Sequence, residues 1–199
     1  MPPIEIGTIK MLQIQQSRLK LGEKPNRVYD PSPIMTIKRM LVTSDGAYGI
    51  TDDHQQIVDV HNKHHFDTRY NPGRTLSIGF TSHYDEMREK YGAHITDGIA
   101  GESIIVESTR HYTMADFNGG LVILDPKTED EIHLNVTGGI APCVPFSKFS
   151  LQRDFESPEE EKATLQFLHD GQRGFLLEPD YGTQQTFLLQ TGFKVFITS

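Results

Sequence analysis

The sequence contains one cysteine and no tryptophan in 199 residues. A single cysteine excludes a disulfide within the chain, and a reducing compartment is the simplest location for such a chain. The first residues, Met1–Ile6, contain neither a basic region nor an apolar run, so they are not typical of a signal peptide. No apolar stretch reaches the length of a membrane-spanning helix. The sequence therefore predicts a cytoplasmic protein without a membrane partner.

Basic residues are also fewer than acidic residues. The chain has 19 lysines and arginines against 27 aspartates and glutamates, which gives a formal net charge of −8. Nucleic acids and anionic membranes both favour proteins with a basic face, so we expect neither as the main partner. Hydrophobic residues make up 36% of the chain and charged residues 23%, an ordinary globular balance. A chain of this length is expected to form a single domain over residues 1–199.

Long helical patterns are scarce, and short β-branched segments between turn residues dominate the sequence. Residues 131–137 alternate most clearly between apolar and polar side chains, as in a half-buried strand. The other predicted strands cover residues 4–14, 34–43, 56–60, 75–81, 103–107, 120–125, 174–177, 186–189 and 193–197. Many short strands predict a mostly β fold, a closed or nearly closed β-barrel, because closure removes exposed strand edges.

Two segments carry the signals of principal helices. The first covers residues 83–91 and stops at Gly92. The second covers residues 157–169 and begins with the capping-box sequence Ser157-Pro158-Glu159-Glu160, with proline at the first helical position. Consecutive glutamates at this point suit the positive end of a helix dipole, so they indicate a helix start rather than a metal site.

Cys143 is the residue with the clearest potential for chemistry, because of where it lies. It follows the predicted strand at 131–137, which the Gly138-Gly139 pair is expected to end. Pro142 and Pro145 stiffen the backbone on either side of the thiol. Reactive groups often occupy such loops on a rigid scaffold.

The thiol of Cys143 needs nearby groups that favour its ionised form in order to react. A cysteine of ordinary pKa is only about 3% ionised at pH 7, so a reactive Cys143 requires nearby cations. Lys148 and Arg153 are close in sequence. The alternative is that Cys143 is a small buried side chain without chemistry, which is the usual role of an unpaired cysteine.

Two other groups of residues could in principle bind a ligand. Residues 91–103 contain three glycines before a predicted strand and form a turn whose N–H groups could face an anion, but the Lys and Ser/Thr of a phosphate loop are missing. An ordinary turn is the simpler interpretation. The second group consists of four histidines, His54, His61, His64 and His65. No acidic or cysteine partner completes a recognised metal pattern, so we expect no metal there.

Three stretches, taken in order along the chain, resemble the MOSC family, which is named for the C-terminal domain of molybdenum-cofactor sulfurases. The family's glycine-rich segment is matched by Asp97–Val106 (DGIAGESIIV). Its strand pair ending in a cysteine loop is matched by Asn118–Cys143 (NGGLVILDPKTEDEIHLNVTGGIAPC). Its terminal arginine-glycine segment and last strands are similar to Gly171–Ile197 (GQRGFLLEPDYGTQQTFLLQTGFKVFI). The resemblance covers about residues 35–197.

The resemblance implies a free-standing β-barrel in which a cysteine carries sulfur as a persulfide, or ligates molybdenum in a molybdopterin cofactor. That cysteine would be Cys143, and Gly101, Glu102 and Arg173 would bind the cofactor. We therefore expect the thiol at the mouth of a cleft, with the Gly101-Glu102 turn and Arg173 nearby, where a cation such as Arg173 would lower the thiol pKa. The implied partners are a sulfur donor or acceptor protein, or a small-molecule ligand. Whether the protein is an enzyme is left open.

The sequence departs from the family next to the cysteine. An arginine usually stands shortly before the Pro-Cys pair, and Ile140 and Ala141 occupy those positions here. Because arginine is the usual bidentate partner of phosphate, its loss argues against binding of a pterin phosphate. A second interpretation is a non-catalytic module that binds a small molecule or a partner at the barrel mouth, in which case Cys143 would be inert.

Overall fold

The structure is a computed structural model that describes residues 2–180 and 186–198. Its central strands are β1 (Ile4–Gln15), β8 (Leu76–Phe80), β9 (Ile104–Glu107), β10 (Leu121–Leu124), β11 (Glu131–Gly139), β12 (Phe175–Pro179) and β14 (Lys194–Ile197). A second sheet contains β5 (Arg39–Thr43), β6 (Gly46–Ile50), β7 (Gln56–Val58) and β13 (Thr186–Gln190). The remaining strands are β4 (Ile34–Ile37) and the hairpin strands β2 (Lys20–Leu21) and β3 (Val28–Tyr29). The helices are α1 (Thr81–Tyr91), α2 (Val144–Leu151) and α3 (Pro158–Phe167), with short 3-10 turns η1 (Pro72–Arg74) and η2 (Met114–Phe117).

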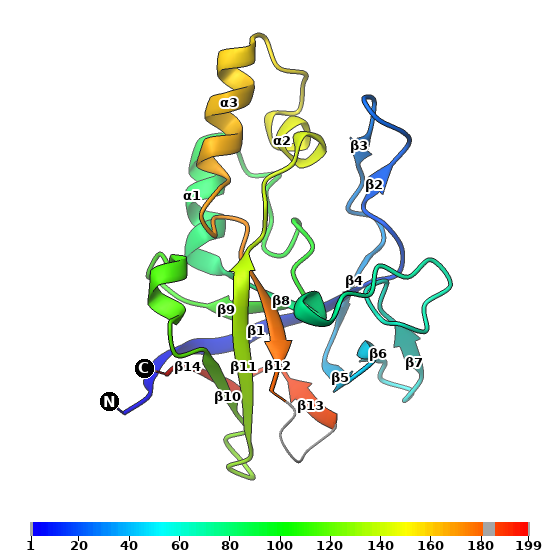
Figure 1. Ribbon diagram of the computed structural model, residues 1–199. Helices are drawn as coiled ribbons and strands as arrows, with labels where there is room; N and C mark the ends of the chain where they lie inside the picture. The colour runs from blue at the N-terminus through cyan, green and yellow to red at the C-terminus, as the bar shows by residue number, and fades with distance from the viewer. Residues whose placement is uncertain (1, 181–185, 199) are drawn as a thin grey trace.

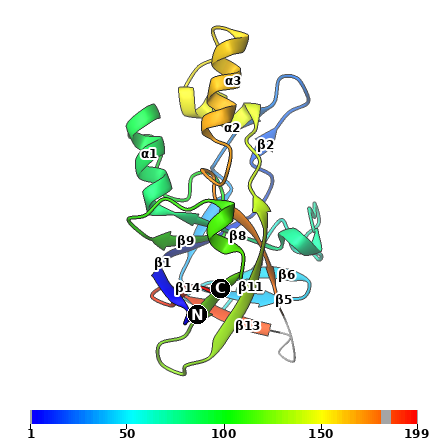
Figure 2. The same cartoon turned by 60° about the vertical axis from the view of Figure 1, so that its left-hand side comes forward.

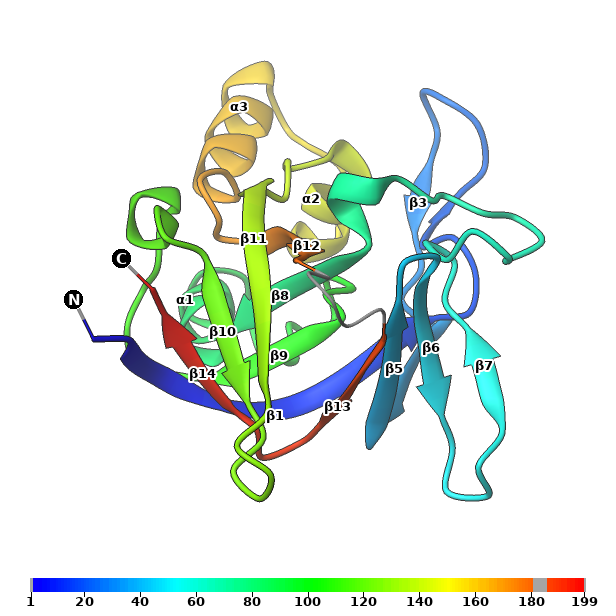
Figure 3. The ribbon, with the colours of Figure 1, turned by 60° about the horizontal axis from the view of Figure 1, so that its bottom comes forward.

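The central strands form a closed barrel of seven strands, as the sequence predicts. Their order is β14-β10-β11-β12-β8-β9-β1, and β14 pairs back onto β1 (Figure 1). Strands β8 and β9 are parallel, which requires a long crossover; α1 and the glycine-rich turn after it make this connection. The predicted strand at residues 34–43 is in fact two strands, β4 on the barrel sheet and β5 in the second sheet. Figure 3 shows the second sheet beside the barrel.

The alternation read from the sequence builds the core. Along β11, Ile132 and Leu134 are buried while Glu131 and His133 are exposed, so the predicted pattern is confirmed. Side chains from the barrel and from the second sheet join in one hydrophobic cluster. Burial of each large aliphatic or aromatic side chain in such a cluster contributes about 1.5–3 kcal/mol.

Strand β11 runs two residues beyond the predicted strand, so the Gly138-Gly139 pair forms its last two positions instead of interrupting it before them. Gly138 pairs with Leu176 and Gly139 with Phe175, after an irregularity in the register, so both glycines belong to the strand. A Cβ at Gly139 would lie 3.2 Å from the backbone nitrogen of Gly171. The missing side chain therefore allows the turn before β12 to pack against the end of β11.

The helices and the β2–β3 hairpin all lie at one end of the barrel (Figures 1 and 2). Helices α1 and α3 are the two predicted ones, and the Ser157 hydroxyl caps α3 by accepting from the backbone N–H of Glu160. Helix α2 was not predicted; it begins directly after Cys143. Within the described ranges, no helix combines the length and the apolarity needed to cross a membrane.

A second hydrophobic cluster fills the space between this end of the barrel and the helices. Tyr84 and Met87 enter it from α1, and Phe146 enters it from α2. The hairpin contributes Tyr29, whose ring lies 5.0 Å from that of Phe146 in an edge-to-face arrangement. Cys143 packs at the margin of this cluster.

Candidate functional site

Cys143 is the residue from which α2 starts. Its backbone is extended (φ −144°, ψ 145°), and its carbonyl accepts the first helical hydrogen bond from the Ser147 N–H at 3.0 Å. Pro145 fits in the first turn, where the missing N–H costs nothing. The thiol is half-buried. Because the positive end of the helix dipole lies at this terminus, the position favours a thiolate over a neutral thiol.

Arg173 lies directly against the thiol. Its Nη1 is 3.5 Å from the sulfur of Cys143 and also donates to the carbonyl of Ala141 at 3.3 Å. Its Nη2 donates to the carbonyl of Ala100 at 3.2 Å, and its guanidinium carbon lies 4.3 Å from the ring centre of Phe146. The side chain is only 4% exposed. One guanidinium thus joins three segments that are far apart in sequence.

Glu102 is fully buried next to Gly174, the residue that follows Arg173. Its side chain passes close to two glycines: a Cβ at Gly79 would lie 3.3 Å from its Cδ, and one at Gly174 would lie 3.1 Å from its Cγ. The Tyr84 hydroxyl donates to Oε2 at 2.5 Å, while Oε1 finds no hydrogen-bond partner among the described residues. Burial raises the pKa of Glu102, although the Tyr84 hydrogen bond and the Arg173 charge oppose the rise.

Gly101 is required by the shape of the turn. Its φ is +94°, and a Cβ there would lie 2.5 Å from a methyl carbon of Leu19. Its N–H donates to the Gly98 carbonyl, and its own carbonyl accepts from Gln15 Nε2 at 2.7 Å. The neighbouring N–H of Ala100 donates to a tyrosine hydroxyl. These backbone groups therefore serve the fold, in agreement with the interpretation of an ordinary turn.

The thiol pKa is set by several opposed effects. Burial raises the pKa of Cys143, but the charges of Arg173 and Lys20 and the backbone N–H of Phe146 outweigh it, so the pKa lies below its ordinary value. Lys20 comes from the β2–β3 hairpin, and nothing in the sequence connects it to the cysteine. The two cations that are close in sequence pair elsewhere, Lys148 with an aspartate and Arg153 with a glutamate.

We expect Lys20→Ala to slow alkylation of Cys143 roughly twofold at neutral pH and low salt, because one of two cations near the thiolate is lost. The effect should shrink at high ionic strength, since Lys20 is exposed. Lys148→Ala is the matched control. It removes a lysine that is five residues from Cys143 in sequence but pairs with Asp154. Iodoacetamide rates across a pH series measure both; equal slowing in the two variants would contradict this assignment.

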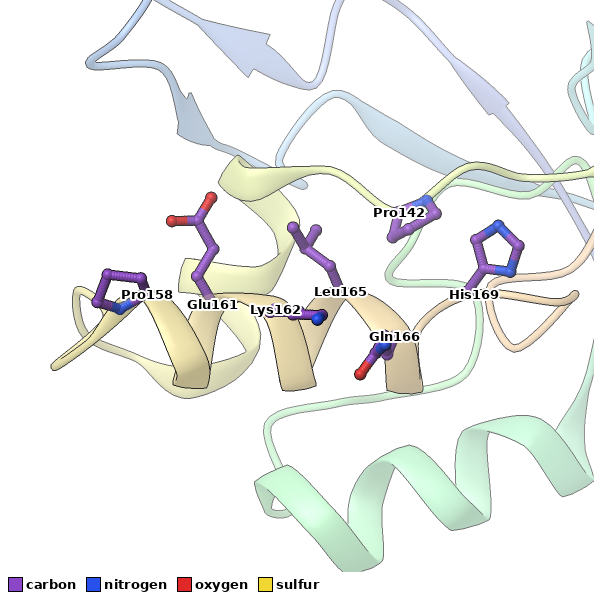
Figure 4. A pocket seen from close by; sticks show the side chains of 7 residues that line it. All are labelled: Pro142, Pro158, Glu161, Lys162, Leu165, Gln166 and His169. Carbon is purple, nitrogen blue, oxygen red and sulfur yellow. The ribbon is translucent and has the colours of Figure 1, made fainter.

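An open groove follows α3 and reaches the residue before the cysteine (Figure 4). It is lined by Pro142, Pro158, Glu161, Lys162, Leu165, Gln166 and His169. The thiol itself is not part of this lining, although we expected it at the mouth of a cleft. Pro142, the residue before Cys143, is thus the part of the lining that is nearest to the thiol in sequence.

Comparison with known proteins gives similarity in fold rather than in sequence. No family model matches the chain, and no curated protein matches it either. The YuaD protein of Bacillus subtilis is 13% identical with a TM-score of 0.57, over 97% of each chain. YiiM from Geobacillus stearothermophilus, a MOSC-domain protein, is 15% identical with a TM-score of 0.51, over 99% of this chain and 76% of the other. The fold is MOSC-like. At these identities the likeness concerns the fold alone.

The MOSC-like fold brings together the three stretches that carry the resemblance. Cys143 and Arg173 are in contact, and Arg173 also holds the Ala100 carbonyl of the turn that leads to Gly101 and Glu102. The roles of these four residues stay predictions. Two participants escaped sequence analysis, Tyr84 and Lys20, because they come from a helix and a hairpin that only folding brings to the site.

The histidines of this MOSC-like chain point to different partners. His61 Nδ1 lies 3.0 Å from Asp59, and His64 Nε2 lies 2.9 Å from Asp45. His65 contacts a backbone carbonyl instead. In residues 2–180 and 186–198, no group of three or more histidine, cysteine or acidic side chains is placed to hold a metal ion. The expectation that the histidines bind no metal stays a prediction.

Proposed function

We propose that this protein carries sulfur as a persulfide on Cys143 and passes it to an acceptor. The contact between Arg173 and the Cys143 sulfur carries this proposal. A structural cysteine has no need of a buried guanidinium, whereas a reactive one needs a cation to stabilise its thiolate. The half-buried position of the thiol also leaves it a route to a second molecule.

The transfer balances without an external oxidant or reductant. The Cys143 thiolate attacks the outer sulfur of a donor persulfide, R–S–SH. A new S–S bond forms to Cys143 while the S–S bond of the donor breaks, and the inner donor sulfur leaves as the thiolate R–S⁻. The proton on the transferred sulfur travels with it. The reverse attack by an acceptor thiolate unloads the carrier and restores the Cys143 thiolate.

The guanidinium of Arg173 can stabilise Cys143 both before loading and after unloading. Negative charge lies on the Cys143 sulfur before loading and after unloading, and Arg173 is held next to it by the carbonyls of Ala100 and Ala141. Because this guanidinium is already oriented, it stabilises the charge without a rearrangement. Lys20 is exposed beside the thiol and can meet the charge of a donor or acceptor sulfur.

The residues around the thiol do not fit the phosphate of a molybdopterin. Arg173 is 4% exposed and its two terminal nitrogens already donate to carbonyls and to the sulfur. Ile140 and Ala141 stand where the family has an arginine, and Lys20 is a single exposed cation. A bidentate phosphate site is therefore missing among the described residues near Cys143, and no step of the proposed transfer passes through that cofactor.

Whole-protein mass spectrometry tests the carrier directly. After incubation with glutathione persulfide and removal of the reagent, we expect the protein to gain one sulfur atom that a reductant removes. Cys143→Ser is the control and should gain none, because the chain has no other cysteine. A wild-type protein that gains no sulfur would contradict the proposal, and a thiol that is alkylated only after unfolding would in addition favour the non-catalytic binding module.

A further inference from the structure

His83 on α1 is a buried histidine whose protonation is decided by its partners. The backbone N–H of Tyr112 donates to Nε2 at 2.9 Å, so this nitrogen is the acceptor. The proton therefore lies on Nδ1, which donates to the carbonyl of Gly171 at 2.9 Å. The residue is 1% exposed, and burial, with a smaller effect of the adjacent His111, lowers the pKa of His83 to about 4. The ring is accordingly neutral at neutral pH, with Glu86 as the acidic group near it.

The same histidine holds the next residue of the chain as well. Gln172 Nε2 donates to the backbone carbonyl of His83 at 2.9 Å. The turn is narrow: Gly171 has a φ of +88°, and the Gly174 N–H donates back to the Gly171 carbonyl at 2.6 Å. One hydrogen bond donated by the His83 ring and one accepted by the His83 carbonyl thus fix the Gly171 backbone and the Gln172 side chain immediately before Arg173.

We infer that His83 is a positioning residue for Arg173, which it holds against the Cys143 sulfur through the backbone of Gly171 and the side chain of Gln172. The inference rests on the proposed function only in so far as the thiolate is the working form of Cys143. Coulomb attraction weakens with distance, and Arg173 lies at 3.5 Å from the sulfur, so a small shift of the turn moves the guanidinium off the thiol.

Two substitutions at His83 separate the hydrogen bond to the Gly171 carbonyl from the hydrogen bond to the Tyr112 N–H. In His83→Asn the amide nitrogen occupies the place of Nδ1 and keeps a donor for the Gly171 carbonyl. In His83→Gln the amide reaches the place of Nε2, so the partner of the Tyr112 N–H is kept and the donor for Gly171 is lost. Both variants place a neutral amide in the same buried space, so their costs in stability are comparable.

The readout is the rate of alkylation of Cys143 by iodoacetamide across a pH series on the native protein. We expect His83→Gln to react about threefold more slowly than wild type at neutral pH, with the profile displaced to higher pH, and His83→Asn to react like wild type. Wild-type profiles in both variants, or equal slowing in both, would overturn the inference and leave His83 a structural residue.

Should either variant fail to fold, Gln172→Ala removes the second bond to His83 and should slow alkylation in the same direction; an unchanged profile in it would overturn the inference too. Alkylation needs no sulfur donor, so this result is independent of the carrier proposal. A wild type that takes up no sulfur ends the carrier proposal, whereas the difference between the asparagine and glutamine variants decides the role of His83.

Discussion

Replacing Arg173 by methionine is expected to slow alkylation of Cys143 at neutral pH roughly tenfold, because loss of an opposite charge in contact with the thiolate raises the thiol pKa. The sign follows from the direction of the shift. The folded protein holds the pKa of Cys143 below its ordinary value, so the thiolate persists to a lower pH than in a free cysteine. Without the guanidinium, the thiolate is lost at a higher pH. The whole rate profile should therefore move to higher pH.

Arg173→Lys is the matched variant for this experiment. It keeps a positive charge near the thiol but loses the planar fork that donates to the carbonyls of Ala100 and Ala141. We expect its profile to lie closer to wild type than that of Arg173→Met, with a comparable loss of stability. Identical profiles for the lysine and methionine variants would show that the charge of residue 173 does not control the thiol.

Gly174→Ala should cause a large loss of stability, about 3 kcal/mol or more in the free energy of unfolding. Gly174 has a φ of +85°, and a Cβ there would lie 2.2 Å from the backbone oxygen of Ile78 on β8. A backbone atom in a barrel strand cannot move aside as the tip of a side chain can. The substitution therefore combines an unfavourable conformation with a steric clash next to the site.

Gly192→Ala measures the conformational part alone. Gly192 has a φ of +89°, almost the same as Gly174, but no atom of the described residues lies within 4 Å of the point that a Cβ would occupy there. We expect a loss of about 1–2 kcal/mol, the usual cost of a left-handed conformation for a residue with a side chain. Urea unfolding of both variants gives the comparison. Equal losses would mean that the contact between residue 174 and β8 relaxes freely.

The fold followed from the sequence wherever a local pattern was strong. The alternation at residues 131–137 predicted β11 and its buried face, and Ser157 with Pro158 predicted the start of α3. The number of short strands predicted a closed barrel. Such patterns are visible because strand period and helix capping depend on neighbouring residues in the chain.

Short elements were harder to predict. Helix α2 has eight residues, and Pro142 and Pro145 were interpreted as stiffening a loop, although a proline in the first turn is also typical of a helix start. The Gly138-Gly139 pair was interpreted as the end of a strand. The strand does end there, but both glycines are still paired with β12, and that pairing is not encoded in the local sequence.

The sequence by itself determined that Cys143 is the sole thiol and that Glu102 and Arg173 lie in stretches resembling one family. The resemblance suggested Arg173 as a cation near the thiol, but only the tertiary structure decided that it contacts the sulfur, that Lys20 of the hairpin joins it, and that Lys148 pairs elsewhere. The role of His83 was equally hidden. The reason is physical, since a thiol pKa depends on charges within a few ångströms in space, and closure of the barrel, not distance along the chain, brings them there.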